Sequence, residues 1–208
     1  MKKGVKYLVL LLLTSVFLTG CGSSAEEEEA QTQPQQELYP VTIDGTEVRL
    51  GETTVQALLD KGLTLTVSEA DENMNITEYE IDPEMELERD SYYSGASISI
   101  SDNLFAHISL VTGPSTTRMG DAVIASMEFY FQSADKSELE KISFNGVPVT
   151  EISREKAGEM FPDFTGDDNM WLQYGLDYDY TLSFDTDKML VKLSLSKKYD
   201  VDWSSGDQ

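Results

Sequence analysis

Histidine and cysteine, the side chains most often used in nucleophilic and zinc-dependent chemistry, occur once each in this chain, as His107 and Cys21. The common zinc sites need several such ligands, so one of each cannot build them. A Ser-His-Asp triad would have to use His107, and the sequence has no Gly-x-Ser-x-Gly turn to present a nucleophile. The alternating pattern of residues 104–110 places His107 on the polar face of a strand, so we interpret it as a surface histidine.

Neither the Ser-x-x-Lys pattern nor pairs of carboxylates indicate a catalytic site in this sequence. Ser-x-x-Lys occurs three times, at Ser133/Lys136, Ser153/Lys156 and Ser194/Lys197. The Ser-Asp-Asn and Lys-Thr-Gly motifs that accompany it in penicillin-binding enzymes are absent from the sequence. Carboxylate pairs can hydrolyse glycosides, but 38 acidic residues make the choice of any pair arbitrary. We therefore predict no catalytic residue and no cofactor, with a carboxylate-dependent cell-wall hydrolase as the alternative.

An acidic loop, Asp163-Phe-Thr-Gly-Asp-Asp-Asn169, offers a concentrated set of hard oxygen ligands. Asp163, Asp167 and Asp168 could coordinate Ca²⁺. Their spacing differs from that of an EF-hand loop, however, and we interpret the segment as a solvated turn. The prediction is no metal site, with these three carboxylates as the candidates if one exists.

The next segment, residues 170–180, is rich in aromatic side chains. Aromatic rings beside an acidic loop can form a surface that recognises sugars, peptides or cationic groups. Trp171 and Tyr174 are the residues that would contribute to such a recognition surface. The alternative is that these rings cover the end of a sheet as part of the core.

The first 20 residues have the organisation of an export signal. Lys2, Lys3 and Lys6 form a short basic segment, and residues 7–18 are almost wholly apolar. A membrane-spanning helix needs about 20 apolar residues. The apolar run is shorter than that, so a signal peptide over residues 1–20 is the better interpretation.

The end of that run, Leu18-Thr-Gly-Cys21, resembles the lipobox of bacterial lipoproteins. The resemblance implies cleavage between Gly20 and Cys21 and attachment of a diacylglycerol to the Cys21 thiol. Two acyl chains give stable anchoring where one would be marginal. We therefore expect a lipid anchor on Cys21 that holds the protein on the extracytoplasmic face of the cell membrane.

Composition divides the remaining chain into a tether and one folded domain. Residues 22–37 contain no large apolar side chain and cannot offset the entropy cost of ordering, so residues 21–38 are predicted to be a lipidated, disordered acidic tether. Residues 39–203 are predicted to fold as a single domain. Residues 204–208 are predicted to form a tail.

The chain is strongly acidic, with 15 basic and 38 acidic residues and a net charge of −23. Removing residues 1–20 removes three lysines and no acid, which leaves 12 basic against 38 acidic residues and a net charge near −26. Such a charge excludes nucleic acid as a natural partner and favours cationic partners. A lipidated Cys21 could form no disulfide, so the domain must depend on its hydrophobic core.

Local patterns predict an α+β fold, an antiparallel β-sheet with two short helices. Residues 41–50 carry a hairpin signal, because Asp44-Gly45 supplies the positive φ angles of a type I′ turn. Thr53 and Gln56 match a capping box at the start of a helix over residues 54–61. Further alternating runs predict strands at residues 63–67, 76–81, 96–100, 104–111, 123–131, 178–184 and 189–195.

A similar hairpin and helix recur about 100 residues later. Residues 142–149 carry a hairpin signal around Asn145-Gly146, and Ser153 is predicted to cap a helix over residues 154–161. The chain would then contain two hairpin–helix–strand pseudo-repeats, in halves 39–131 and 139–203. The other side chains match poorly, so an internal duplication and a coincidence of common motifs both remain open.

The segment Val41-Thr-Ile-Asp-Gly through Leu50-Gly-Glu-Thr-Thr-Val-Gln-Ala-Leu-Leu-Asp-Lys-Gly62 resembles the opening of surface lipoproteins from Firmicutes-type Gram-positive bacteria. That likeness covers about 22 residues together with the lipobox. The group has no assigned activity. The order of hairpin, helix and strand is also similar, in architecture alone, to the tandem modules of β-lactamase-inhibitor-like proteins.

These observations favour a non-enzymatic, membrane-anchored lipoprotein whose domain binds a protein or ligand of the cell envelope. The hydrolase and a structural envelope protein are the alternatives. A pocket of acids with shifted pKa values would favour the hydrolase, whereas a flat surface with aromatic side chains would favour binding.

Overall fold

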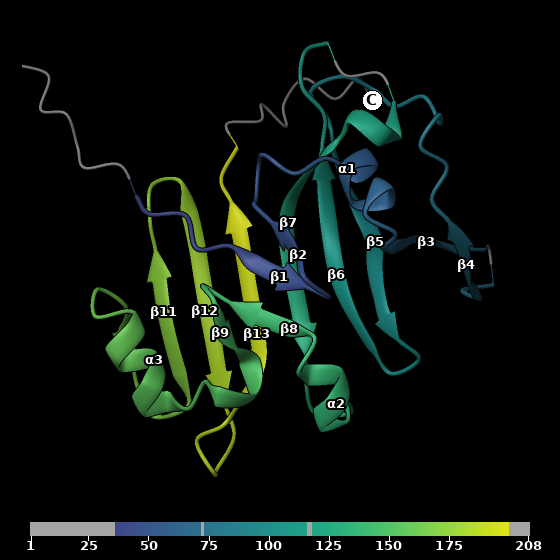
Figure 1. The fold of residues 1–208 in the computed structure, drawn as a ribbon. Coiled ribbons are helices and arrows are strands. Elements are labelled where there is room, and N and C mark those ends of the chain that lie inside the picture. Colours follow the sequence, from purple (N-terminus) through teal and green to yellow (C-terminus); the bar gives the residue numbers. More distant parts are fainter. Residues whose placement is uncertain (1–35, 72, 116–117, 200–208) are drawn as a thin grey trace, which may run out of the picture. The chain divides into compact units, whose positions relative to one another are not determined.

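The computed structural model describes residues 36–71, 73–115 and 118–199, which are mainly antiparallel β-sheet (Figure 1). The large sheet contains β3 (Thr64–Ala70), β4 (Ile76–Glu80), β5 (Tyr92–Ser101), β6 (Leu104–Val111), β7 (Val123–Tyr130), β10 (Thr165–Gly166), β11 (Met170–Tyr174), β12 (Tyr178–Phe184) and β13 (Leu190–Lys197). The small sheet contains β1 (Val41–Ile43), β2 (Thr46–Val48), β8 (Ile142–Phe144) and β9 (Val147–Pro148). The strand orders are β10-β11-β12-β13-β7-β6-β5-β3-β4 and β2-β1-β8-β9. The predicted α+β class is confirmed at this level.

The described residues form three short α-helices, one more than predicted. They are α1 (Val55–Asp60), α2 (Lys136–Leu139) and α3 (Arg154–Met160), with 3₁₀ turns η1 (Met119–Asp121) and η2 (Val149–Glu151). The additional helix, α2, is a single turn between β7 and β8. The Glu138 carboxylate accepts a hydrogen bond of 2.7 Å from the Asp135 backbone N–H. The spacing Asp135-x-x-Glu138 is that of a capping box, which was not among the predicted helix starts.

Helix α1 begins one residue later than predicted. Thr54, not Thr53, is the N-cap of α1, and its hydroxyl accepts a hydrogen bond of 3.2 Å from the Ala57 N–H. The Thr53 hydroxyl instead accepts from the Arg49 N–H at 2.9 Å and closes the preceding turn. The cap of α3 is as predicted, since Ser153 accepts from the Lys156 N–H at 3.1 Å.

The two hairpins of the small sheet have the predicted turns, and they pair with each other. Asp44 and Gly45 have φ values of 47° and 79°, and Asn145 and Gly146 have φ values of 48° and 76°. These are the positive angles that a type I′ turn requires at both central positions. β1 pairs with β8 in an antiparallel ladder centred on Thr42 and Ser143, with Val41 opposite Phe144 and Ile43 opposite Ile142.

The hydrogen bonds at the ends of this ladder match each other. Asp44 N donates to Lys141 O at 2.8 Å, and Asn145 N donates to Pro40 O at 2.9 Å. Each donor follows its strand by one residue, and each acceptor precedes the opposite strand by one residue. The β1–β8 pair is therefore closed in the same way at both ends.

The first residues of α1 and of α3 also bond to the chain beside the start of a strand. In each case this is the last strand in that half of the chain. In the first half, Val55 N donates to Ala122 O (3.0 Å) and Ile124 N donates to Thr53 O (2.9 Å). In the second half, Arg154 N donates to Lys188 O (2.9 Å) and Leu190 N donates to Ile152 O (3.2 Å). Those last strands, β7 and β13, pair with each other in the middle of the large sheet.

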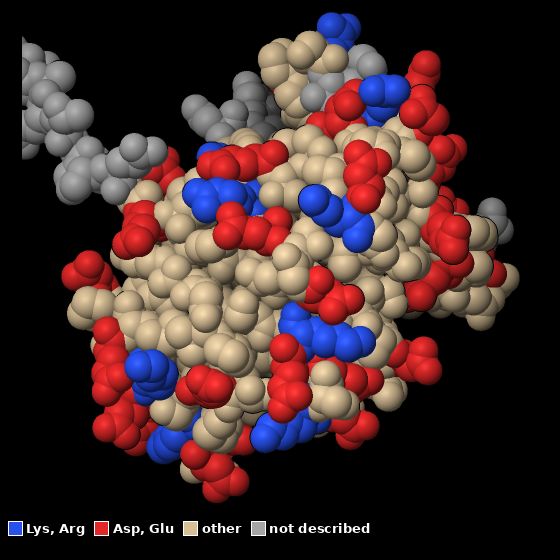
Figure 2. Space-filling model, viewed as in Figure 1, with Lys and Arg blue, Asp and Glu red and all other residues tan. Residues whose placement is uncertain are grey.

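The small sheet and the helices α1 and α3 lie on one side of the large sheet (Figure 1). Figure 2 shows this side, where acidic and basic side chains are scattered among uncharged surface and acidic ones are frequent along the margin. The burial pattern agrees with this one-sided covering. In β6 and β12, for example, alternate residues are buried and the intervening ones are exposed or partly exposed.

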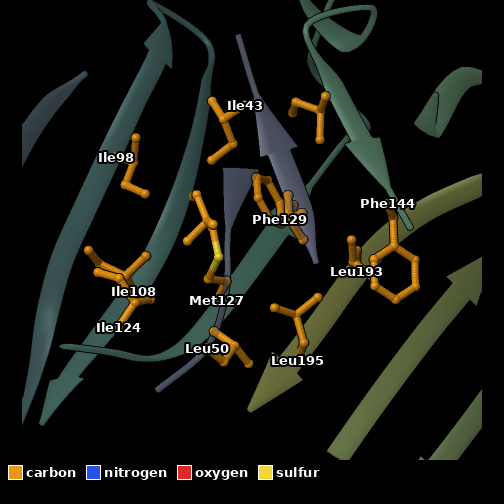
Figure 3. Close-up of a cluster of buried hydrophobic side chains, with 14 of the residues drawn as sticks. Ile43, Leu50, Ile98, Ile108, Ile124, Met127, Phe129, Phe144, Leu193 and Leu195 are labelled. Carbon is orange, nitrogen blue, oxygen red and sulfur yellow. The ribbon is translucent and has the colours of Figure 1, made fainter. Parts of the chain in front are cut away.

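The hydrophobic core fills the space between the two sheets. Ile43 and Phe144 of the small sheet point toward Met127, Phe129 and Leu193 of the large sheet (Figure 3). A group of aromatic rings extends this core toward α3, with centroid distances of 4.8–6.3 Å among its members, which are Tyr39, Phe144, Phe161, Phe164 and Tyr180. Edge-on and stacked rings at such distances add to the stabilisation from burial alone.

The folded region starts earlier than the predicted boundary at residue 39. The Gln36 side chain amide donates to Tyr178 O at 2.8 Å and accepts from the N–H groups of Asp177 and Tyr178 at 3.0 and 2.8 Å. It lies so close to Gly175 that a Cβ on that glycine would come within 2.0 Å of it. Residues 36–38, assigned to the tether from the sequence, therefore belong to the domain.

The packing between the sheets predicts a large difference between two phenylalanines. Phe144 is fully buried, whereas Phe105 on the opposite face of the large sheet is 41% exposed. We expect Phe144→Ala to lower the free energy of unfolding by about 3–5 kcal/mol because it leaves a cavity between the sheets. Phe105→Ala is the control and should cost less than about 1 kcal/mol. Urea denaturation measures both, and equal losses would contradict this account of the core.

Candidate functional site

The face of the large sheet opposite the small sheet carries a continuous row of polar side chains. The row crosses six strands, and each neighbouring pair is in register: Thr66, Ser97, His107, Glu128, Ser194 and Thr181. The strands place these side chains together because residues of one parity on each strand point to the same face. We call this surface the open face.

Serine is the dominant side chain of the open face. A shallow hollow of about 560 Å³ in it is lined by seven serines, Ser68, Ser94, Ser97, Ser109, Ser126, Ser194 and Ser196, together with Tyr92 and His107. The sequence contains the signal for this surface, because serines alternate with apolar residues in residues 97–101 and 193–196. The alternation predicts each strand, whereas the gathering of the serines on one surface depends on the register between strands that are distant in the sequence.

His107 lies at the centre of the open face, exposed as predicted. Its Nδ1 is 3.3 Å from the Ser97 hydroxyl oxygen. Its ring is flanked by Phe105 at 5.9 Å and by Tyr130 at 6.2 Å, measured between ring centroids. Phe105 and Tyr130 are 41% and 47% exposed. The three rings therefore form an accessible aromatic strip beside the serines.

A charged network borders this strip. The Lys192 ammonium lies 2.7 Å from a Glu128 carboxylate oxygen and donates to the Tyr130 hydroxyl at 3.1 Å. The Tyr130 hydroxyl donates to the other Glu128 oxygen. Partial burial raises the pKa of Glu128, but the hydrogen bonds from Lys192 and Tyr130 outweigh it and the pKa lies below its ordinary value. The hydrogen bond to Glu128 raises the pKa of Lys192.

The row Ser97–His107–Glu128 has the residue types of a hydrolytic triad but not its geometry. Both Glu128 oxygens are engaged by Lys192 and Tyr130, so that carboxylate does not orient the imidazole. The strands β5 and β6 also lie inside the sheet, where the backbone N–H groups bond to neighbouring strands. The row therefore lacks the oriented carboxylate of a Ser-His-Glu triad.

The structure separates the two residues proposed from the sequence as a recognition surface. Trp171 pairs with the buried Leu182, so it faces the covered side, while Tyr174 pairs with Asp179 on the open face. The Trp171 indole N–H donates to Phe161 O at 3.1 Å, and the Arg154 guanidinium stacks 3.7 Å from its ring. Trp171 thus attaches α3 to β11. Tyr174, at 68% exposure, is accessible at the end of the open face.

Two of the three aspartates of the acidic loop already bond to other groups of the protein. The Asp167 carboxylate accepts hydrogen bonds from the N–H groups of Asn169 and Met170, and Asp168 forms an ion pair of 3.2 Å with Lys188. Asp163 is exposed at the start of the loop. Within residues 36–71, 73–115 and 118–199, no three His, Cys, Asp or Glu side chains are grouped so that they could hold a metal ion.

The predicted lipid attachment and cleavage positions, Cys21 and Gly20, lie outside the described residues. In the part of the chain that the structure describes, no helix is both long enough and apolar enough to span a membrane. No protein-family model matches the chain, and comparisons with curated proteins and with solved structures give no match.

The pKa shift of Glu128 predicts how the charged network affects stability as the pH changes. Its folded-state pKa is lower than its unfolded-state pKa of about 4.3, so it stabilises the fold fully above that pH. The contribution is lost as the pH falls through the lower, folded-state pKa. The stability difference between the parent chain and Glu128→Gln should therefore shrink below about pH 4. Thermal unfolding from pH 7 to pH 3 measures it, with Glu155→Gln on α3 as the control, and a pH-independent difference would refute the network.

Proposed function

We propose that this chain is a lipid-anchored protein of the extracytoplasmic membrane face and that its domain is a non-enzymatic binding module. The open face is the proposed contact surface for a protein or other ligand of the cell envelope. One observation carries the proposal, namely that the helices and the small sheet cover only the other side of the large sheet. The lipobox Leu18-Thr-Gly-Cys21 and the preceding apolar run support the anchor.

The composition of the open face suits recognition of another protein. Serine adapts its hydrogen bonds at little cost in conformational entropy, and rigid aromatic rings supply contact area, as in antibody binding sites. Small molecules usually bind in deeper pockets that bury most of the ligand. The hollow over Ser126 and Ser194 is broad and shallow, and Phe105, Tyr130 and Tyr174 are accessible around it. A protein surface is therefore the ligand that fits best.

The rival function, a carboxylate-dependent hydrolase, has less support. Glycoside hydrolysis needs a general acid whose pKa is raised so that it keeps its proton near neutral pH. The pKa values of Asp71, Glu128 and Glu138 are shifted in the opposite direction, by hydrogen bonds to the ionised carboxylates. A structural envelope protein remains a second rival, and it would need no specific partner on the open face.

We also propose that the two halves of the domain arose as hairpin–helix–strand pseudo-repeats. The type I′ turns and the N-caps at Thr54 and Ser153 correspond in the two halves. The backbone hydrogen bonds that start α1 and α3 against β7 and β13 also correspond. Coincidence of common turns would not produce matched contacts with the last strand of each half.

Lipidation is tested at the predicted attachment position. We expect Cys21→Ala to abolish incorporation of a labelled fatty acid and to remove the protein from the membrane fraction, because no other residue of the chain has a thiol. The matched control is Ser24→Ala, three residues further on, which should label normally. Acyl labelling of Cys21→Ala at the parental level would rule out this anchor.

The binding role is tested by photo-crosslinking in cells. A photoreactive amino acid at Ser194 lies on the open face, and the same amino acid at Ser143 lies on the small sheet, on the opposite side of the molecule. We expect discrete adducts of higher mass from position 194 and none from position 143. Mass spectrometry then identifies the captured partner. Equal adducts from both positions, or none from position 194, would contradict the proposal.

A further inference from the structure

The two ends of the large sheet differ in how they are protected. At one end, β10 is a two-residue strand, and short edge strands offer little to a new partner. At the other end, β4 has five residues, and all of them are exposed. β4 pairs on one side with β3, and no strand formed by the described residues lies on its other side.

The direction of the free backbone groups of β4 follows from its register with β3. Ile81 N donates to Leu65 O at 3.0 Å and Asp71 N donates to Asn75 O at 2.9 Å. Hydrogen-bonded pairs alternate in an antiparallel ladder. Thr77 and Tyr79 therefore bond to β3, whereas the backbone N–H and C=O groups of Glu78 and Glu80 point away from the sheet.

The side chains along this edge have a defined pattern. Glu78 and Glu80 lie opposite Ser68 and Thr66, so their carboxylates belong to the same side as the open face. Ile76, 72% exposed, continues that row, and Tyr79, 50% exposed, lies on the other side of the strand. Glutamates at alternate positions are solvated and thus compatible with an uncovered edge.

The charge around β4 indicates what could pair with it. Residues 69–90 contain ten acidic residues and one basic residue. In Figure 2, acidic side chains crowd the margin where Figure 1 draws β3 and β4. A second copy added antiparallel would place acidic side chains against acidic ones, which is destabilising, whereas lysines or arginines opposite Glu78 and Glu80 would be favourable.

We propose that the free edge of β4 binds a basic extended segment of another protein, which adds to the large sheet as a further antiparallel strand. Backbone groups of Glu78 and Glu80 supply the hydrogen bonds, and their carboxylates select the partner's side chains. The segment has Lys or Arg at two alternate positions, opposite Glu80 and Glu78. An apolar residue follows two positions later, opposite Ile76. This strand addition uses the backbone edge of β4, so it does not rest on the binding role proposed for the open face.

The test uses the full chain purified in detergent and a fluorescent ten-residue peptide containing Lys-Val-Lys-Thr-Ile between neutral flanks. Anisotropy titration should show saturable binding that weakens as salt is raised. A peptide of the same composition with adjacent lysines, Lys-Lys-Val-Thr-Ile, cannot place both lysines on one face in any register. It should bind at least tenfold more weakly, and so should a peptide with N-methylated backbone.

Variants of the chain separate the backbone contribution from the charge contribution. Glu78→Gln with Glu80→Gln should weaken binding about tenfold, from two lost opposite-charge pairs. Glu78→Pro should abolish binding and leave the thermal unfolding temperature nearly unchanged, because that N–H does not bond to β3. Glu155→Gln with Glu159→Gln makes the same charge change on α3 and should bind normally.

Three outcomes would overturn the proposal. The first is equal affinity for the two lysine arrangements or for the N-methylated peptide. The second is no binding of any peptide. The third is a dimer of the chain, seen by mass photometry, that Glu78→Pro disrupts, since it would assign the edge to a second copy. None of these outcomes bears on crosslinking from the open face, so the two proposals fail separately.

Discussion

The pairing of β1 with β8 is the contact on which the rest of the structure depends. It joins segments about 100 residues apart through three residue pairs, two of which are wholly buried. An isolated two-stranded hairpin is marginally stable in water. Paired, the two hairpins form one apolar surface large enough to cover the middle of the large sheet, where β7 meets β13. Both halves of the chain therefore become ordered around the same core.

This covering also determines which side of the large sheet remains uncovered. One small sheet and two short helices can bury only one side of nine strands, so the other side must be compatible with water. Serines at alternate positions meet that requirement because they are small and polar and still fit a flat sheet. The polar residues at these positions therefore leave a broad surface of hydroxyl groups and aromatic rings.

The sequence predicted the local features well because their causes are local. Asp44-Gly45 and Asn145-Gly146 determine their turns through backbone conformation, and Ser153 caps its helix through its own hydroxyl. The neighbouring threonines before α1 could each serve as cap, but the Thr53 hydroxyl accepts from the Arg49 N–H, and Thr54 is the N-cap. The open face was not predicted, because its members come together only through the order and register of distant strands. The position of Gln36 likewise depends on Gly175, far away in the sequence.

The charge of the chain has little part in holding the fold together. The ion pairs of the described residues join side chains that are at least about one quarter exposed, and such pairs contribute little to stability. Stability must then come from the core, which leaves the excess of acidic residues free to act between molecules. Like charges along an uncovered edge such as β4 disfavour its pairing with a second copy. The basic strand proposed for this edge would be favoured by the same carboxylates.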